Sequence, residues 1–308
     1  MAYARAEQVD VGEDQVAIAI THGTLGSHLG VAYRNGDDAA KLFHLEFHRR
    51  LAIDDYPRAE WLAACVPIDD VAGAQIVALL DGAAKLYPSR SAPGSYDYGI
   101  ALLTGAGSIA PDGAYSPKDG CDGFTCSSIV AEIFRSFGFP LVDLSNWPNR
   151  PINRAWGQAI VCMLDAYGAG PEHVQAVERN ISELRLRPEE VAAAAEQFRS
   201  GHPALFPEVE ARAEEVMAQV RAECAAPPPI PAHHPMAACV VAFQNAVVAA
   251  AAAAPGIDGE PGAQASAQTE VADAQANPKD KPATARRHAV SRWRRLSPKL
   301  RKRRGKKS

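Results

Sequence analysis

Residues 122–134 read DGFTCSSIVAEIF, and this stretch places a cysteine where a polar loop turns into an amphipathic helix. Counted onward from Cys126, apolar side chains recur at intervals of three and four residues, at Ile129, Val130, Ile133, Phe134 and Phe137. This spacing puts them on one side of an α-helix. The sequence therefore predicts a helix that begins near Cys126 and buries one face.

The two ends of this helix carry recognisable signals. Thr125, or Asp122 slightly earlier, is suited to cap its start, and Gly138 followed by Pro140 is suited to end it. The first turn of a helix carries the positive end of the helix dipole, which favours the thiolate form of a cysteine. Cys126 therefore has the placement of a nucleophile, although a lone cysteine is also interpreted as a small buried hydrophobic residue.

Two predicted strands upstream each contribute a histidine. Residues 27–33 (SHLGVAY) and 41–48 (KLFHLEFH) alternate, and a turn containing Gly36 joins them. If the loop has three or five residues centred on Gly36, the large apolar side chains of both strands share a face and His28 lies directly opposite His44. A two-residue loop would instead place His28 opposite a phenylalanine. We expect the first register, because it buries the apolar faces together.

The other elements follow from similar patterns. Residues 15–21 predict a strand and residues 71–87 predict a helix. Residues 88–119 are rich in Gly, Ser, Pro and Tyr, and we interpret them as a long ordered loop, such as a substrate lid. After residue 151 the chain becomes helical in character, with helices expected at 155–167, 171–184, 188–199 and 208–223.

The six cysteines are spread through 308 residues, which is too sparse for a disulfide scaffold, and they lack zinc-site spacing. We interpret them as reduced thiols in a cytoplasmic protein, or in one exported without a cleaved signal peptide, because the N-terminus has no apolar core. The most apolar run, residues 237–255, is too short and too rich in alanine to predict a membrane span. No metal or organic cofactor is required.

Residues 27–33, the hairpin and the following Leu42-Phe43-His44 resemble the histidine half of circularly permuted NlpC-type papain-like enzymes. These include lecithin–retinol acyltransferase-like proteins and bacterial YiiX-like hydrolases. Residues 124–130 (FTCSSIV) resemble the cysteine half, and residues 12–16 (GEDQV) resemble the Gly-Asp that often opens the first strand. The resemblance covers roughly residues 12–142, and the insertion at 88–119 departs from the family pattern.

The resemblance implies Cys126 as nucleophile, His28 as general base and His44 as the group that orients His28. Glu46, on the same strand face as His44, is an alternative orienting group, and His22 is an alternative base. We expect a cysteine hydrolase that forms an acyl-enzyme and cleaves an amide bond in a peptide, an isopeptide or peptidoglycan. Lipid acyl transfer and thioester cleavage are the alternatives within this fold, and an inactive scaffold is the competing class.

The implied fold class is α+β, with an antiparallel sheet packed on the cysteine helix. We expect a permuted papain-like catalytic domain in residues 1–150 and a helical extension in residues 151–225. A linker rich in Pro and Ala, largely disordered, is expected in residues 226–285, before a basic tail in residues 286–308.

The charge is strongly polarised along the chain. The whole chain has a net charge of −4, whereas residues 279–308 hold 14 Lys and Arg residues and one acid, which leaves −17 for the rest. Such a tail is suited to an anionic membrane surface or to nucleic acid, and it is equally interpreted as a solvated tail with weak attraction to polyanions.

Overall fold

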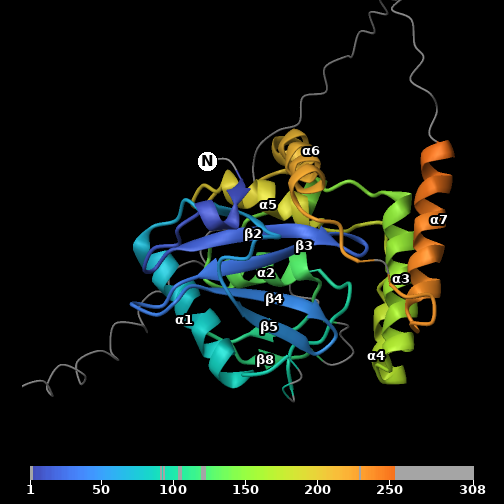
Figure 1. The fold of residues 1–308 in the computed structure, drawn as a ribbon, viewed down its shortest axis with the longest axis horizontal. Coiled ribbons are helices and arrows are strands. Elements are labelled where there is room, and N and C mark those ends of the chain that lie inside the picture. Colours follow the sequence, from blue (N-terminus) through green and yellow to red (C-terminus); the bar gives the residue numbers. More distant parts are fainter. Residues whose placement is uncertain are drawn as a thin grey trace, which may run out of the picture. The chain divides into compact units, whose positions relative to one another are not determined.

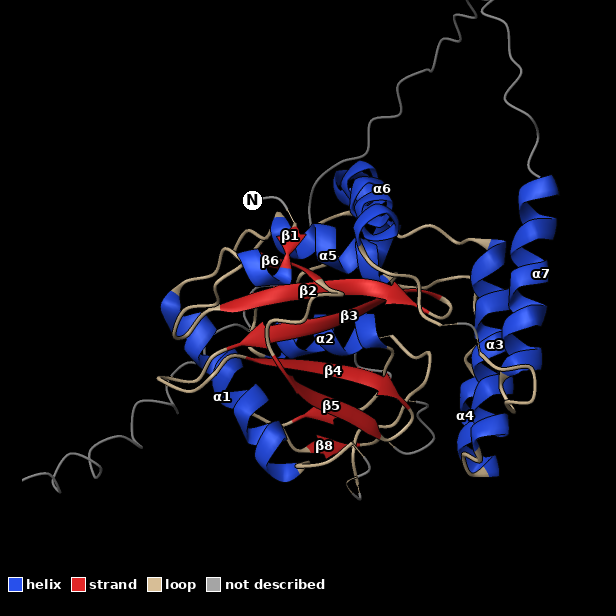
Figure 2. Cartoon of the chain, in the orientation of Figure 1, coloured by secondary structure: helices blue, strands red, loops and turns tan. Residues whose placement is uncertain are grey.

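A computed structural model describes residues 3–90, 92, 94–102, 106–118, 123–228 and 230–253. Its centre is a six-stranded antiparallel sheet with the strand order β1-β6-β2-β3-β4-β5 (Figure 2). A separate two-stranded sheet pairs β7 with β8. The strands are β1 (Ala4–Arg5), β2 (Val16–Gly23), β3 (Gly26–Tyr33), β4 (Lys41–Phe47), β5 (Arg50–Asp55), β6 (Leu62–Cys65), β7 (Ser108–Ile109) and β8 (Tyr115–Ser116).

Seven α-helices surround the sheet within the described residues (Figure 1). The cysteine helix α2 packs against β3 and β4, while α5 and α6 pack against β2. The α+β class is therefore confirmed. The helices are α1 (Asp70–Leu86), α2 (Cys126–Ser136), α3 (Pro151–Tyr167), α4 (Pro171–Arg179), α5 (Pro188–Glu196), α6 (Phe206–Glu223) and α7 (Ala237–Ala253), with short 3₁₀ turns at Ala6–Gln8 and Leu144–Asn146.

The sheet has two different faces because side chains alternate along each strand. Leu29, Val31 and Phe43 lie on one face and belong to the same buried core as the apolar side of α2. The other face is built from smaller residues, such as Ala17, Ala32 and Leu42, and forms a second core with Tyr56 and Trp61. His28 lies four residues before Ala32 on β3, and His44 lies two residues after Leu42 on β4. Side chains an even number of residues apart share a face, so both histidines lie on this second face.

The register between β3 and β4 differs from the expected one by two residues. The structure pairs Val31 with Phe43 and Tyr33 with Lys41, so extension of this ladder would set His28 opposite Glu46 instead of His44. The connecting segment is longer than a tight turn because it covers residues 34–40. A shift of two residues leaves every side chain on the same face of the sheet, so the prediction that His28 and His44 share a face is confirmed. The prediction that His28 lies directly opposite His44 is wrong.

The helices α3 to α6 belong to the same core as the sheet, whereas Cys239 and Val240 of α7 form a small separate cluster with Met163. Val191 of α5 and Val216 of α6 are fully buried in the main core together with residues of β2 and α2. Contacts join residues 1–255 into one unit, so the structure shows no domain boundary at residue 150. The apolar faces of these helices explain this arrangement, because they need the sheet to cover them.

Residues 88–119 are an integral part of the core where they are described. Tyr96 is fully buried, and its hydroxyl donates a hydrogen bond of 2.6 Å to the carbonyl oxygen of Gly113. The strands β7 and β8 add a short ladder within this segment. The expectation of an ordered loop is therefore confirmed for the described part, whose residue Tyr98 lines the pocket, and its role as a substrate lid stays a prediction.

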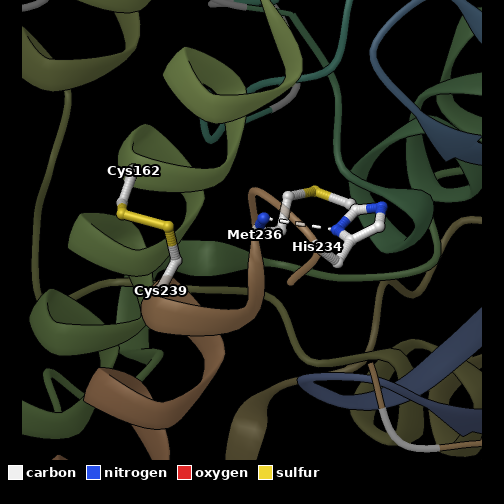
Figure 3. The surroundings of a disulfide bond; sticks show 4 residues. All are labelled: Cys162, His234, Met236 and Cys239. Atoms are coloured by element: carbon white, nitrogen blue, oxygen red, sulfur yellow. Dashed lines mark hydrogen bonds between the residues drawn. A yellow bond between two sulfur atoms is a disulfide. The ribbon is translucent and has the colours of Figure 1, made fainter. Parts of the chain in front are cut away.

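A disulfide joins Cys162 of α3 to Cys239 of α7, and Figure 3 shows this bond beside His234 and Met236. Two of the six cysteines are therefore paired, which corrects the expectation that all are reduced. The helix α7 also corrects the linker assigned to residues 226–285, because its alanine-rich sequence forms a helix that packs along α3 (Figure 1). Residues from 254 onward, including the basic tail at 286–308, lie outside the described residues.

Candidate active site

The start of α2 is held in place by a complete set of capping hydrogen bonds. The Thr125 hydroxyl accepts a hydrogen bond of 2.9 Å from the Ser128 backbone, and the Ser128 hydroxyl accepts one of 2.8 Å from the Thr125 backbone. Ser127 donates a hydrogen bond of 2.7 Å to the carbonyl of Leu186, which ties this turn to the segment before α5. Cys126, the first residue of α2, therefore has a fixed position.

The backbone that leads into Cys126 depends on a glycine. Gly123 has φ of +99°, and a Cβ at this position would lie 2.2 Å from the carbonyl oxygen of Asp97. Phe124 pairs with the same segment, since its backbone N–H donates to Asp97 and its carbonyl accepts from Gly99. The segment around Tyr98 therefore forms one wall beside Cys126. Asp122, the alternative cap, lies outside the described residues, as does Cys121.

His28, His44 and Asp54 form a hydrogen-bonded chain. His28 Nε2 lies 2.9 Å from His44 Nδ1, and His44 Nε2 lies 3.2 Å from Asp54 Oδ2. An ionised carboxylate only accepts hydrogen bonds, so His44 carries its proton on Nε2 and its Nδ1 accepts the proton of His28 Nε2. In neutral His28 this leaves the lone pair on Nδ1. The chain thus selects the tautomer that a general base needs.

Asp54 is held as an anion by its neighbours. The hydrogen bond from His44 and the adjacent Arg90 guanidinium hold the pKa of the Asp54 carboxyl well below its usual range, against the opposing effect of burial. Arg58 also donates a hydrogen bond to this carboxylate. Glu46, the alternative orienting group, forms ion pairs with Arg50 and Arg90 at 3.3 and 3.1 Å, so it is His44 that contacts His28.

Two further residues allow the histidines to approach each other. A Cβ on Gly30 would lie 2.8 Å from the Phe43 carbonyl oxygen and 3.0 Å from the Cβ of His44, so the close packing of these strands requires glycine. Trp61 places its ring edge-to-face against both histidines, with centroids 5.6 Å from His28 and 5.2 Å from His44. The tryptophan thereby shields the hydrogen bond between them from water.

Cys126 and His28 open into the same pocket, a cavity of about 320 Å³ at the end of the β2–β3 hairpin. His44, Ser127 and Arg185 also line this pocket, and α3 supplies an apolar wall. All three residues predicted from the sequence therefore line this pocket, although His28 and His44 lie on the sheet face opposite the one that packs on α2. The apolar lining consists of Leu25, Phe47, Trp156, Ile160 and Met163.

The sulfur of Cys126 lies against the backbone of β3 next to His28. Backbone N–H groups of Leu29, Ser127 and Cys126 hydrogen-bond the thiol and lower its pKa, as does the charge of Arg185. Burial is the largest influence, and it raises the pKa of the thiol overall. The expectation of a thiolate favoured by the helix dipole is therefore wrong for this state, because desolvation of a buried sulfur outweighs the nearby donors.

Burial and the neighbouring His44 lower the pKa of His28 to about 3, so its imidazole is neutral at physiological pH. The described residues contain no hydrogen bond between the Cys126 sulfur and a histidine ring. The arrangement is thus a neutral thiol and a neutral imidazole that share a pocket. This pairing suits removal of the proton during attack on a substrate, in contrast to a preformed ion pair.

Arg185 places a positive charge in the pocket wall. Its guanidinium carbon lies 3.7 Å from the centroid of the Trp156 ring, in a stacked cation–π contact. Burial lowers the pKa of Arg185 to about 10, which leaves it charged at neutral pH. The electrostatic influence of this residue reaches the Cys126 thiol. The pocket therefore holds a thiol, a neutral imidazole and a cation together.

Sequence reasoning missed Asp54, Trp61 and Arg185. Asp54 lies near the end of β5, a strand that begins directly after a turn at Arg49, where φ is +53°. If the alternating pattern of β4 is continued after this turn as an antiparallel strand, Asp54 comes to lie near His44. Arg185 lies between α4 and α5, where no local pattern connects it to Cys126.

The other candidate histidines lie elsewhere or have other contacts. His22 lines the pocket, but its Nδ1 lies 3.2 Å from the carbonyl oxygen of Gly23. His48, Asp97 and His173 have potential metal-ligating atoms within 4.8 Å of one another. Arg49 pairs with Asp97 at 2.9 Å, and His173 Nε2 donates to the Tyr98 carbonyl oxygen at 2.8 Å. These contacts indicate a structural cluster that holds the segment around Tyr98.

Comparisons with known proteins leave the family open: no family model, no curated protein and no solved structure matches this chain significantly. The described helices also include none with the length and apolar content needed to cross a lipid bilayer. The geometry of the pocket is therefore the basis for any statement about function.

Proposed function

We propose that this protein is a cysteine hydrolase with a permuted papain-like arrangement, in which Cys126 forms an acyl-enzyme. His28 is the general base, and His44 with Asp54 orients it. The observation that carries the proposal is the hydrogen-bonded chain from His28 to Asp54, which opens into the same pocket as a cysteine at a helix start.

The proposed reaction begins when His28 Nδ1 removes the proton of Cys126 as the sulfur attacks a carbonyl carbon. A carbon–sulfur bond forms, and the electron pair of the carbonyl double bond moves to oxygen. The backbone N–H of Cys126 at the start of α2 is a donor for that oxyanion. The intermediate collapses, the carbon–leaving-group bond breaks, and imidazolium His28 gives its proton to the leaving group. Water, deprotonated by His28, then attacks the carbonyl carbon of the thioester; the carbon–sulfur bond breaks, the acid leaves, and His28 returns the proton to the sulfur of Cys126.

Two features of the surroundings of His28, its burial and its hydrogen bond with His44, support its role as base. Because His28 is neutral in the folded protein, it can accept a proton at neutral pH, and His44, which is held by Asp54, accepts a hydrogen bond from His28 Nε2 and so fixes the orientation of the ring. The low pKa of His28 follows chiefly from its burial. A negative charge that develops on sulfur or on the substrate oxygen raises the basicity of His28 at the moment of transfer.

We propose an amide bond of a peptide, an isopeptide or peptidoglycan as the scissile group, because polar side chains gather around Cys126. A second candidate is an ester or thioester with an aliphatic acyl group, as in a lipid acyltransferase or thioesterase. It is favoured by the apolar pocket wall that α3 supplies through Trp156, Ile160 and Met163.

The proposal is tested with p-nitrophenyl acetate, a generic acyl donor. We expect a burst of about one p-nitrophenol per protein molecule and an acetyl group on the peptide that contains Cys126. The burst should disappear in Cys126→Ala and persist in Cys224→Ala, a matched change at another buried free cysteine. Absence of acetylation at Cys126 in the folded wild-type protein would contradict the proposal. Peptide, peptidoglycan and lipid acyl donors are then added as competitors of p-nitrophenyl acetate. The extent to which each one reduces the p-nitrophenol burst ranks the substrate classes.

A further inference from the structure

Arg185 is attracted electrostatically by the Glu189 carboxylate, but no hydrogen bond reaches its Nε. Its Nε is buried and has no hydrogen-bond partner, and its guanidinium forms no ion pair with the carboxylates in the described part of the chain. A buried donor without a partner is costly, and a guanidinium presents several donors in one plane. The Trp156 ring covers one face of that plane, so the remaining interactions are directed along its edge.

The acidic residues closest to this region already have partners. Glu46, which also lines the pocket, is paired with Arg50 and Arg90. Glu189 attracts Arg185 electrostatically without an ion pair between them, and its carboxylate accepts a hydrogen bond from the neutral hydroxyl of Ser27. The edge of the Arg185 guanidinium is thus unmatched within the described pocket wall.

We propose that Arg185 binds a carboxylate group of the substrate and thereby selects acidic substrates for Cys126. This inference rests on the proposed function and specifies its substrate class. The substrate is an amide or ester that carries a free carboxylate near the scissile carbonyl, such as a peptide with an acidic side chain or a terminal carboxyl group at that point.

A single carboxylate suits this site better than a phosphate. One planar guanidinium matches the two oxygens of a carboxylate in a bidentate pair. A phosphate with close to two negative charges would place more negative charge beside the carboxylates of Glu46 and Glu189 than a single carboxylate would. The stacking on Trp156 also fixes the guanidinium plane, so the pair loses little conformational entropy on binding.

Two alkylating reagents of similar size test this preference without knowledge of the natural substrate. Iodoacetate carries a carboxylate, and iodoacetamide is its neutral counterpart; in each case the Cys126 sulfur displaces iodide and its proton leaves to His28 or water. We measure the ratio of the two alkylation rates at Cys126 by mass spectrometry of its peptide. A short cysteine peptide in solution gives the reference ratio.

We expect the ratio of iodoacetate to iodoacetamide rates at Cys126 to exceed the reference ratio, and to fall about tenfold in Arg185→Met. Methionine keeps an apolar contact with Trp156, and circular dichroism checks that the variant is folded. Arg179→Met, which removes the same charge from an exposed site on α4, should leave the ratio unchanged. An equal ratio in wild type and Arg185→Met would overturn the proposal.

A second measurement does not depend on a reactive cysteine, so it separates this inference from the proposed function. In ¹⁵N-labelled Cys126→Ala protein, the Nε–H signal of Arg185 is assigned by its loss in Arg185→Met. We expect this signal to shift on addition of N-acetylglycine and to stay in place with N-acetylglycinamide. An unshifted signal with both compounds overturns carboxylate binding, even if Cys126 is acetylated as proposed. Shifts together with an unreactive Cys126 would retain the anion site and reject the hydrolase.

Discussion

Replacement of Asp54 by asparagine removes the negative charge at the end of the histidine chain while it keeps the size of the side chain. Asp54 accepts a hydrogen bond from His44 at 3.2 Å and fixes the proton of His44 on Nε2. Through His44 it fixes the tautomer of His28, whose Nε2 lies 2.9 Å from His44 Nδ1. An asparagine that turns its NH₂ group toward His44 would reverse both tautomers and place a proton on the nitrogen that acts as base.

The magnitude follows from the hydrogen bond that is lost. A hydrogen bond to a charged group contributes about 1.5–3 kcal/mol, which corresponds to roughly 10- to 150-fold in a rate. Arg58 and Arg90 share the carboxylate of Asp54, and both are more than one third exposed. Their presence reduces the net charge felt by His44, so we expect a loss near the lower limit, about tenfold.

The assay is the rate of the p-nitrophenol burst in Asp54→Asn, with Asp55→Asn as the control. Asp55 is the exposed neighbour on β5 and makes the same change in net charge. We expect Asp54→Asn to slow Cys126 acetylation about tenfold at neutral pH and Asp55→Asn to leave it within twofold. If the two variants acetylate at the same rate, then Asp54 does not act through His44 and this reasoning is refuted.

Three further changes test other parts of the structure. Gly30→Ala would set a Cβ 2.8 Å from the Phe43 carbonyl oxygen. We therefore expect the free energy of unfolding, measured with urea, to fall by about 1–3 kcal/mol and the p-nitrophenol burst to become slower. Unchanged values would contradict the close approach of the two strands. Cys239→Ser removes the disulfide to Cys162, and we expect faster hydrogen exchange in α7 while the sheet keeps its protection. Burial lowers the pKa of His48 to about 4, so the unfolded chain takes up a proton below pH 6.5 that the folded protein resists. Its contribution to the free energy of unfolding is therefore complete above pH 6.5 and falls by up to about 1.4 kcal/mol per pH unit toward pH 4. His48→Gln should flatten this dependence of stability on pH. An equal slope in both proteins would show that folding does not change the pKa of His48.

The local patterns of the sequence were sufficient for the elements that position the cysteine and the two histidines. The capping signal at Thr125 and the apolar periodicity after Cys126 correspond to α2 and its capping box. The parity argument placed His28 and His44 on one face, and it tolerated an error of two residues in register because side chains repeat with period two.

Other features depend on tertiary contacts that a local pattern does not contain. Asp54 reaches His44 only because β5 folds back on β4, and Arg185 reaches the pocket from a connection between two helices. The pairing of Cys162 with Cys239 spans 77 residues and two helices, so spacing gave no signal for it. The raised pKa of Cys126 likewise follows from how deeply the folded protein buries the sulfur.

The central claim is that His28 takes the proton of Cys126, and a comparison of two histidine variants tests it most directly. Both His28 and His22 line the pocket, but only His28 belongs to the chain with His44 and Asp54. We measure acetylation of Cys126 by p-nitrophenyl acetate at neutral pH in His28→Gln and His22→Gln. We expect at least a 100-fold slower acetylation in His28→Gln and a rate within twofold of wild type in His22→Gln. A wild-type rate in His28→Gln would contradict the claim.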